Sequence, residues 1–129
     1  MNTDGHGFGP TESELTHAII GSSFEALNAL GHVLHEKPYE NALVDEFGFR
    51  RLPFEQQRSF DVLYKNVRVS EFIPDLIVGG KIIVDAKVIN QITDLERGQM
   101  LNYLRITRLH LGLIINFRRP KLEWERIAL

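Results

Sequence analysis

Residues 74–87 read Pro-Asp-Leu-Ile-Val-Gly-Gly-Lys-Ile-Ile-Val-Asp-Ala-Lys, and the rest of the chain is best understood from this stretch. Two apolar runs of β-forming residues flank a Gly-Gly pair, a pattern that predicts a β-hairpin. Three charged residues, Asp75, Asp85 and Lys87, are set into these runs. Because burying a charge is costly, a half-buried hairpin would not need them for its own stability.

The length of the hairpin loop decides whether these charges share a face. Side chains alternate between faces along a strand, so Asp85 and Lys87 point the same way. A two-residue loop would pair Asp75 with Val84 and place it on the opposite face. A three-residue loop at 79–81, which glycine backbone permits, pairs Asp75 with Asp85. We predict the longer loop, with the pairs Asp75–Asp85, Leu76–Val84 and Ile77–Ile83.

Two carboxylates and an ammonium on one face have a clear chemical use. Carboxylates a few ångströms apart repel each other unless a divalent cation lies between them. Hard oxygen ligands suit Mg²⁺ or Mn²⁺. Lys87 could position or help deprotonate a water and stabilise charge on a phosphate, which suggests metal-assisted hydrolysis of a phosphodiester. The alternative is that the three charges belong to the exposed face of an ordinary hairpin.

Composition limits the classes of protein to consider. The 129 residues, 43% hydrophobic and 25% charged, are sufficient for one globular domain, expected at 11–129 after a flexible tail at 1–10. The chain has no cysteine, which excludes disulfides and thiolate metal sites and favours a cytoplasmic location. Its apolar runs are too short to span a membrane. The net charge of −2 argues against a bulk electrostatic nucleic-acid binder, so phosphate contacts require a local patch or a metal.

Two capping boxes, each a threonine followed three residues later by glutamate, predict helix starts at Thr11 and Thr93. The first helix continues at helical intervals to Gly31, and the later one to about Arg105.

A further helix is expected around Pro38, which suits a first helical turn, and should run to about Phe47 with Gly48 as its end. Glu36 lies just ahead of this helix and Glu40 in its first turn. Attraction to the helix dipole explains both acids, but one of them could instead complete a metal site on the sheet.

From residue 52 the pattern becomes strand-like. Three antiparallel strands are expected at 54–64, 67–78 and 81–88, the first two joined by a turn at Lys65-Asn66. A strongly apolar run at 109–117 predicts an interior strand, and 122–127 an edge strand. The expected fold class is therefore α/β (α+β), with a mixed central sheet of about five strands flanked by helices.

Two features near the C-terminus admit either a structural or a functional interpretation. Gln99 and Tyr103 are four residues apart and share a helix face. Gln99 suits the surface and Tyr103 the core. Both could instead hydrogen-bond a phosphate or a metal-bound water if that helix face meets the hairpin. Between residues 105 and 126 lie six Lys or Arg against two acids. We interpret this basic region as protection of an edge strand in preference to a backbone-binding patch.

The order of these elements and motifs resembles the PD-(D/E)XK nuclease superfamily, and more narrowly the GxxExxY family of small bacterial and archaeal proteins. The likeness runs from about residue 15 to 129. Val33 stands where the family has its first glycine, and Asp85 is the shorter of the two acids found before x-Lys. The matching motifs are Leu30-Gly31, Glu36-x-x-Tyr39-Glu40-x-Ala42-Leu43, Asp75 with Asp85-x-Lys87, Gln99-x-Leu101-Asn102-Tyr103-Leu104, Ile115-Asn116-Phe117 and Pro120-Lys121-Leu122.

The resemblance implies a restriction-endonuclease-like fold and a Mg²⁺- or Mn²⁺-dependent nuclease, with DNA favoured over RNA. Asp75 and Asp85 would hold the metal, with Glu36 or Glu40 as a further ligand. Lys87 would orient the attacking water and steady the phosphate.

On the same resemblance, Gln99 and Tyr103 would position the substrate backbone. Two other functions stay open: a non-catalytic nucleic-acid or protein interaction module, and a structure-selective, resolvase-like endonuclease acting as a homodimer. An enzyme acting on a small nucleotide is disfavoured, because the chain has no Gly-rich phosphate loop.

Overall fold

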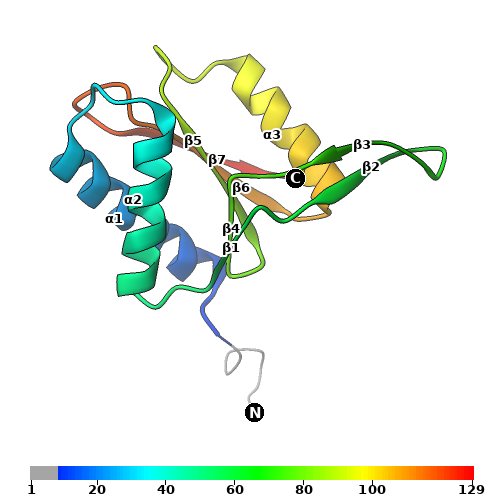
Figure 1. Ribbon diagram of the computed structural model, residues 1–129, viewed down its shortest axis with the longest axis horizontal. Helices are drawn as coiled ribbons and strands as arrows, with labels where there is room; N and C mark the ends of the chain where they lie inside the picture. The colour runs from blue at the N-terminus through cyan, green and yellow to red at the C-terminus, as the bar shows by residue number, and fades with distance from the viewer. Residues whose placement is uncertain (1–8) are drawn as a thin grey trace.

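The computed structural model describes residues 9–129, so most of the flexible tail expected at 1–10 lies outside the described residues. Three helices flank a five-stranded sheet, and a separate two-stranded hairpin projects from its side (Figure 1). The helices are α1 (Glu12–Leu30), α2 (Glu36–Phe49) and α3 (Asp94–Thr107). The strands are β1 (Phe54–Gln56), β2 (Phe60–Tyr64), β3 (Val67–Phe72), β4 (Leu76–Val78), β5 (Ile82–Lys87), β6 (Leu111–Asn116) and β7 (Glu123–Ala128).

The sheet is mixed, with strand order β1-β4-β5-β6-β7. Strands β5 and β6 are parallel and are connected through α3, while the other neighbours in the sheet are antiparallel. As predicted, the apolar run before Phe117 is an interior strand, and the last strand lies at an edge. The predicted fold class, a mixed sheet of about five strands flanked by helices, is therefore confirmed.

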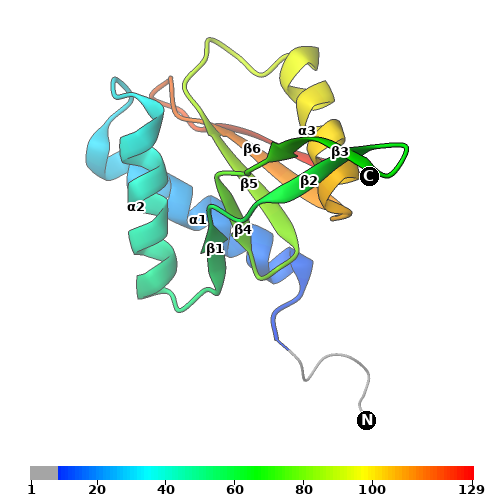
Figure 2. The ribbon, with the colours of Figure 1, turned by 45° about the vertical axis from the view of Figure 1, so that its right-hand side comes forward.

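The helices cover both faces of the sheet (Figure 2). Helices α1 and α2 pack on one face, where Leu15 and Leu43 meet Val84 and other buried strand residues. Helix α3 packs on the other, where Met100 and Leu104 form a smaller cluster with Ile83, Ile92 and Ile114. Since side chains alternate along β5, the charged residues at 85 and 87 lie on the Ile83 side of the sheet. The sheet thus directs the predicted site residues of β5 to its α3 face.

Close packing of α3 depends on a glycine in β6. A Cβ added at Gly112 would lie 2.3 Å from the sulfur of Met100. Any larger residue at this position would require the buried Met100 side chain to move. No helix among residues 9–129 is long and apolar enough to cross a membrane.

Both predicted capping boxes are present, at Thr11 and Thr93. The predicted end of α2 at Gly48 is wrong, because the helix continues to Phe49. The chain leaves the helix through Arg51, whose φ of 57° is in the left-handed region where glycine is usual. Glu36 proves to be the first helical residue, so the helix dipole acts on Glu36, whereas Glu40 lies beyond the first turn. The helix at Thr93 extends past Arg105 to Thr107.

Of the three strands predicted between residues 54 and 88, the first two, at 54–64 and 67–78, are each broken in two, which corrects the expectation. The first breaks after Gln56, where Gln57 has a φ of 60°. The second breaks at Pro74, which has no N–H for a strand ladder. As a result β1 pairs with β4 in the main sheet, and β2 and β3 form their own hairpin. The predicted turn at Lys65-Asn66 is confirmed, with positive φ at both residues.

Candidate active site

The hairpin of β4 and β5 has the predicted register. Leu76 pairs with Val84 and Ile77 with Ile83, which leaves residues 79–81 as the three-residue loop. Gly79 and Gly80 have φ values of 63° and 66°, the left-handed conformation that the loop needs. Continued by one residue, this register sets Asp75 opposite Asp85. The two carboxyl groups are close enough that each changes the pKa of the other.

Burial changes the ionisation of this acid pair. The side chain of Asp85 is only 16% exposed, and burial raises its pKa from 3.8 to about 7, with Lys87 opposing the change and Asp75 adding to it. The pKa of Asp75 is also raised, first by burial and next by the charge of Glu40. Two poorly hydrated acids that repel each other attract either protons or a cation.

Lys87 adds a positive charge beside the pair. Its Nζ lies 3.5 Å from Oδ2 of Asp85, on the same face of β5. Burial acts to lower the pKa of Lys87, but the charges of Asp85, Tyr103 and Glu36 outweigh it, and the pKa is raised. This ammonium is therefore a stable positive charge at the acid pair.

The acid pair, Lys87, Glu36 and Tyr103 line one polar pocket of about 220 Å³. Tyr103 reaches it from α3, with its ring stacked on Phe72 of β3 at a centroid distance of 4.2 Å. Burial and the charge of Asp85 raise the pKa of Tyr103, so its hydroxyl is retained as a donor. The pocket is thus formed where α2, α3 and the end of the hairpin meet.

The two predicted glutamates are placed differently. Glu36 lines the pocket, and its Oε2 accepts a hydrogen bond of 3.3 Å from the backbone N–H of Val88, just past β5. Glu40 is 7% exposed and pairs with Lys37 at 3.3 Å, outside the pocket lining. Its charge still raises the pKa of Asp75. Gln99 is half-buried on α3 and is not among the residues that line the pocket.

Within residues 9–129, no group of three or more His, Cys, Asp or Glu could by itself hold a metal ion. A divalent cation does not require one, because Mg²⁺ in proteins keeps several waters and is commonly held by one or two carboxylates. Asp75 and Asp85 are a close pair of hard oxygen donors, and a cation between them would relieve their repulsion. This donor set fits Mg²⁺ or Mn²⁺.

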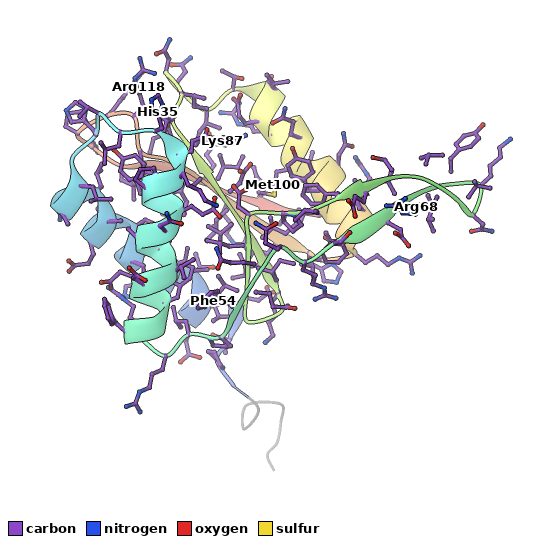
Figure 3. All side chains as sticks on the ribbon, viewed as in Figure 1. His35, Phe54, Arg68, Lys87, Met100 and Arg118 are labelled. Atoms are coloured by element: carbon purple, nitrogen blue, oxygen red, sulfur yellow. The ribbon has the colours of Figure 1, made fainter. Side chains whose placement is uncertain are left out.

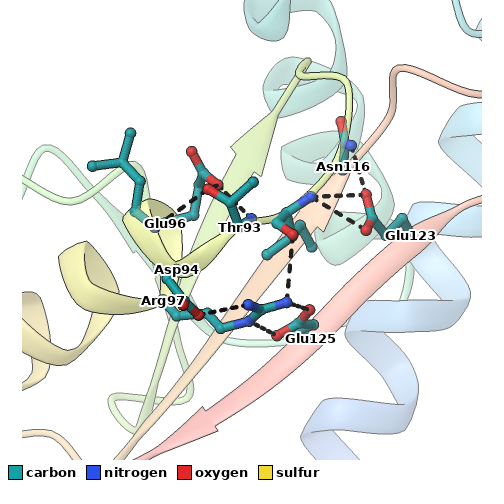
Figure 4. A network of polar contacts seen from close by, with 9 residues as sticks. Thr93, Asp94, Glu96, Arg97, Asn116, Glu123 and Glu125 are labelled. Carbon is teal, nitrogen blue, oxygen red and sulfur yellow. Dashed lines mark hydrogen bonds and ion pairs between the residues drawn. The ribbon is translucent and has the colours of Figure 1, made fainter.

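Sequence reasoning missed a polar network that holds the segment after Lys87 (Figure 4). Asn116, 1% exposed, accepts from the N–H of Ile89 at 3.0 Å and donates to the carbonyl of Ile89 at 2.8 Å. It also donates to Glu123 at 2.9 Å, and Glu123 accepts from the N–H of Ile92 at 3.2 Å. In the sequence, this network was indicated only by Asn116, a polar residue in an otherwise apolar run.

A second part of this network fixes the start of α3. Arg97 donates two hydrogen bonds of 2.7 Å to Glu125 on β7 and one of 2.8 Å to Asp94 (Figure 4). Paired guanidinium and carboxylate groups of this kind are geometrically specific. They hold α3 over the sheet and so set where Tyr103 enters the pocket.

A mixed sheet with helices on both faces, and with an acid pair and a lysine on adjoining strands, defines a restriction-endonuclease-like class of protein. The family described as the PD-(D/E)XK nuclease superfamily matches residues 13–127, and the chain belongs to it. No curated protein and no solved structure matches the chain. Membership supports a nuclease-type function, since this superfamily consists generally of nucleases.

Proposed function

We propose that this protein is a metal-dependent nuclease that hydrolyses phosphodiester bonds in nucleic acid, with DNA as the preferred substrate. The observation that supports this most directly is the convergence of Asp75, Asp85 and Lys87 on one polar pocket. Two acids and a lysine on the exposed face of an ordinary hairpin would not be expected to share a pocket with groups from two helices. Membership of a nuclease superfamily supports the same function.

The metal site in this proposal consists of Asp75 and Asp85, which would hold Mg²⁺ or Mn²⁺. Glu36, on the pocket wall, is the better candidate for a further ligand, and Glu40 would act through its charge on Asp75. When bound, the ion supplies a more acidic water and neutralises charge on the phosphate.

The other residues bind and orient the substrate. The Lys87 ammonium, next to Asp85, would stabilise negative charge that develops on the phosphate and hold the attacking water in place. The Tyr103 hydroxyl would donate to a non-bridging oxygen of the phosphate from the α3 side. Gln99, one turn earlier on α3, would contact the backbone farther along the strand.

We also propose that, within the superfamily, the chain is a member of the GxxExxY family. A structural role for the tyrosine of its Glu-x-x-Tyr motif supports this proposal. Tyr39 is fully buried and stacks on Phe117 at a centroid distance of 4.5 Å. Its hydroxyl donates to the carbonyl of Gly31 and accepts from the N–H of Leu34. Tyr39 therefore holds the turn that leads into Glu36, so that the glutamate reaches the pocket.

The test is cleavage of plasmid DNA and of a matched RNA by the purified chain, with Mg²⁺, with Mn²⁺ and with EDTA. Asp75→Asn, Asp85→Asn and Lys87→Ala should each abolish cleavage while the circular dichroism spectrum stays that of a folded protein. Asp45→Asn, an exposed change on α2, is the matched control and should leave cleavage intact. Full cleavage by the Asp85→Asn or Lys87→Ala variant would count against the assignment.

An anomalous-scattering map from crystals soaked in Mn²⁺ provides a test without catalysis. A peak between Asp75 and Asp85 is the expected result. A folded protein that binds nucleic acid but neither cation would favour the non-catalytic interaction module instead.

One observation favours a second candidate, a dimeric and structure-selective nuclease. The β2–β3 hairpin exposes large apolar side chains, including Leu63, Tyr64 and Val67, each more than half exposed. Its charges balance, with Asp61 and Glu71 against Lys65 and Arg68, so the hairpin suits a second copy of itself better than a phosphate backbone. Sedimentation of the Val67→Lys variant beside the wild-type chain, and cleavage of branched against linear DNA, would distinguish this candidate.

A further inference from the structure

A second and larger hollow, of about 700 Å³, adjoins the active-site pocket. It lies between the turn that joins α1 to α2 and the loop that follows β6, and Glu36 lines both cavities. Its nitrogen-bearing side chains are those of His32, His35 and Arg118. Figure 3 shows His35 and Arg118 close together at the N-terminal end of α2. The two cavities are therefore continuous at Glu36.

The backbone of Arg118 is held at both sides of the residue. Its N–H donates to Oδ1 of the buried Asn116 at 3.2 Å. Its carbonyl oxygen lies 3.2 Å from Nδ1 of His32, which connects the loop to the opposite wall of the hollow. Asn116 is itself held by Ile89 and Glu123. The structure therefore fixes the position from which this arginine side chain extends.

The Arg118 guanidinium has no ion-pair partner among residues 9–129, unlike Arg50, Arg58, Arg68 and Arg97. The loop at 117–122 also carries Arg119 and Lys121, and it contains no acid. In a chain of net charge −2, this is a local excess of positive charge next to an acidic pocket. His35 offers one ring N–H whichever nitrogen carries the proton.

We propose that this hollow is a phosphate-binding subsite, which holds a nucleic-acid phosphate next to the one that is cleaved. Arg118 is its main contact, His35 is a second donor, and His32 is a positioning residue that acts through the Arg118 carbonyl. This assignment rests on the proposed nuclease function, which brings a phosphate chain to the neighbouring pocket. It also gives the basic region a binding role in place of edge protection.

Binding of labelled oligonucleotides by non-cleaving protein tests the subsite. The parent is the full chain with Asp85→Asn, measured by fluorescence anisotropy with a single-stranded 20-mer DNA and with its duplex over a range of salt concentrations. Adding Arg118→Ala should weaken binding roughly tenfold, the scale of one lost charge-assisted hydrogen bond. It should also reduce the slope of log K against log salt by about 0.7 for the single strand and 0.9 for the duplex.

Two further variants make the test specific. Arg118→Lys retains the charge and should restore the salt slope. Arg50→Ala removes the same charge at the other end of α2, roughly 20 Å away for a 14-residue helix, and should leave the slope unchanged. If the Arg118→Ala and Arg50→Ala variants lose DNA affinity equally, the effect comes from the total charge of the protein, and the proposal is overturned. Failure of the parent to bind either DNA would overturn it as well.

The outcome is separable from that of the proposed function. If the wild-type chain does not cleave nucleic acid, but its binding of DNA depends on Arg118, the subsite is supported and the nuclease proposal is wrong. If cleavage is normal and Arg118→Ala does not change DNA binding, the subsite proposal is wrong and the nuclease proposal stands. Inorganic phosphate should compete only weakly with the oligonucleotides, because it replaces one contact among several. Complete displacement of both DNAs by phosphate, at an ionic strength where chloride displaces neither, would mark a site for the free anion and overturn the proposal.

Discussion

Replacing Asp85 by asparagine should stabilise the metal-free protein, although the change removes a residue of the proposed metal site. Burial is the main reason that the pKa of Asp85 is raised in the folded chain. The folded state therefore binds the proton more tightly than the unfolded state does. For an acid shifted in this direction, stability is lost as the pH rises from the unfolded pKa through the folded one. Asparagine resembles the neutral acid in shape and does not ionise.

The size of the effect follows from the pKa values. A rise from 3.8 to about 7 makes the ionised form less stable by about 4 kcal/mol, at about 1.4 kcal/mol for each tenfold change in proton affinity. The side chain is only 16% exposed, so solvent screening does not remove the effect. The Asp85→Asn variant should be more stable than wild type by about 4 kcal/mol at pH 8 and by about 2 kcal/mol at pH 5.5.

The assay is urea unfolding in EDTA, followed by circular dichroism at both pH values. Asp45→Asn, an exposed change on α2, is the control and should show no gain that depends on pH. If Asp85→Asn gives the same change at pH 5.5 and pH 8, or destabilises the protein at pH 8, then burial does not hold the Asp85 proton and the reasoning is wrong.

Three other changes test features that position the site. Gly112→Ala should destabilise the protein by about 1–3 kcal/mol in urea unfolding, because the new methyl group would collide with Met100, whereas Gly98→Ala, which meets no atom within 4 Å, should not. The pKa of Glu125 is lowered by its hydrogen bond with Arg97, so this pair adds stability above the ordinary pKa that is lost as the pH falls through the lowered one. Unfolding measured between pH 3 and 6 should therefore show a shallower acid slope for Glu125→Gln, and an unchanged slope would contradict the role of the pair. Tyr39→Phe should cost about 1 kcal/mol through the lost hydroxyl bond, with Tyr64→Phe on the exposed hairpin as a neutral control.

The sequence allowed the register of the β4–β5 hairpin to be predicted, because alternation, two glycines and the spacing of Asp75 and Asp85 all agreed. Capping boxes similarly located the starts of α1 and α3. These signals are local, so they require no knowledge of distant parts of the chain.

The features that were missed depend on tertiary contacts. Residues 54–78 alternate well enough to suggest long strands. The left-handed backbone at Gln57 and the pairing of β1 with β4 separate the projecting hairpin from the sheet, and Pro74, a local signal, marks the second break. The end of α2 depends on Arg51, a residue with no local preference for that conformation. The approach of Glu36 to the pocket required the fold, because its partner Val88 is distant in the sequence.

The stacking of Phe72 on Tyr103 has a mechanical consequence. Phe72 ends β3, Asp75 follows three residues later, and the hairpin tip lies at the far end of the same strand. Bending of the β2–β3 hairpin would therefore displace Phe72, which contacts the ring of Tyr103 on α3 and lies three residues before Asp75. A partner that binds this hairpin would therefore be expected to shift the Tyr103 hydroxyl relative to the acid pair.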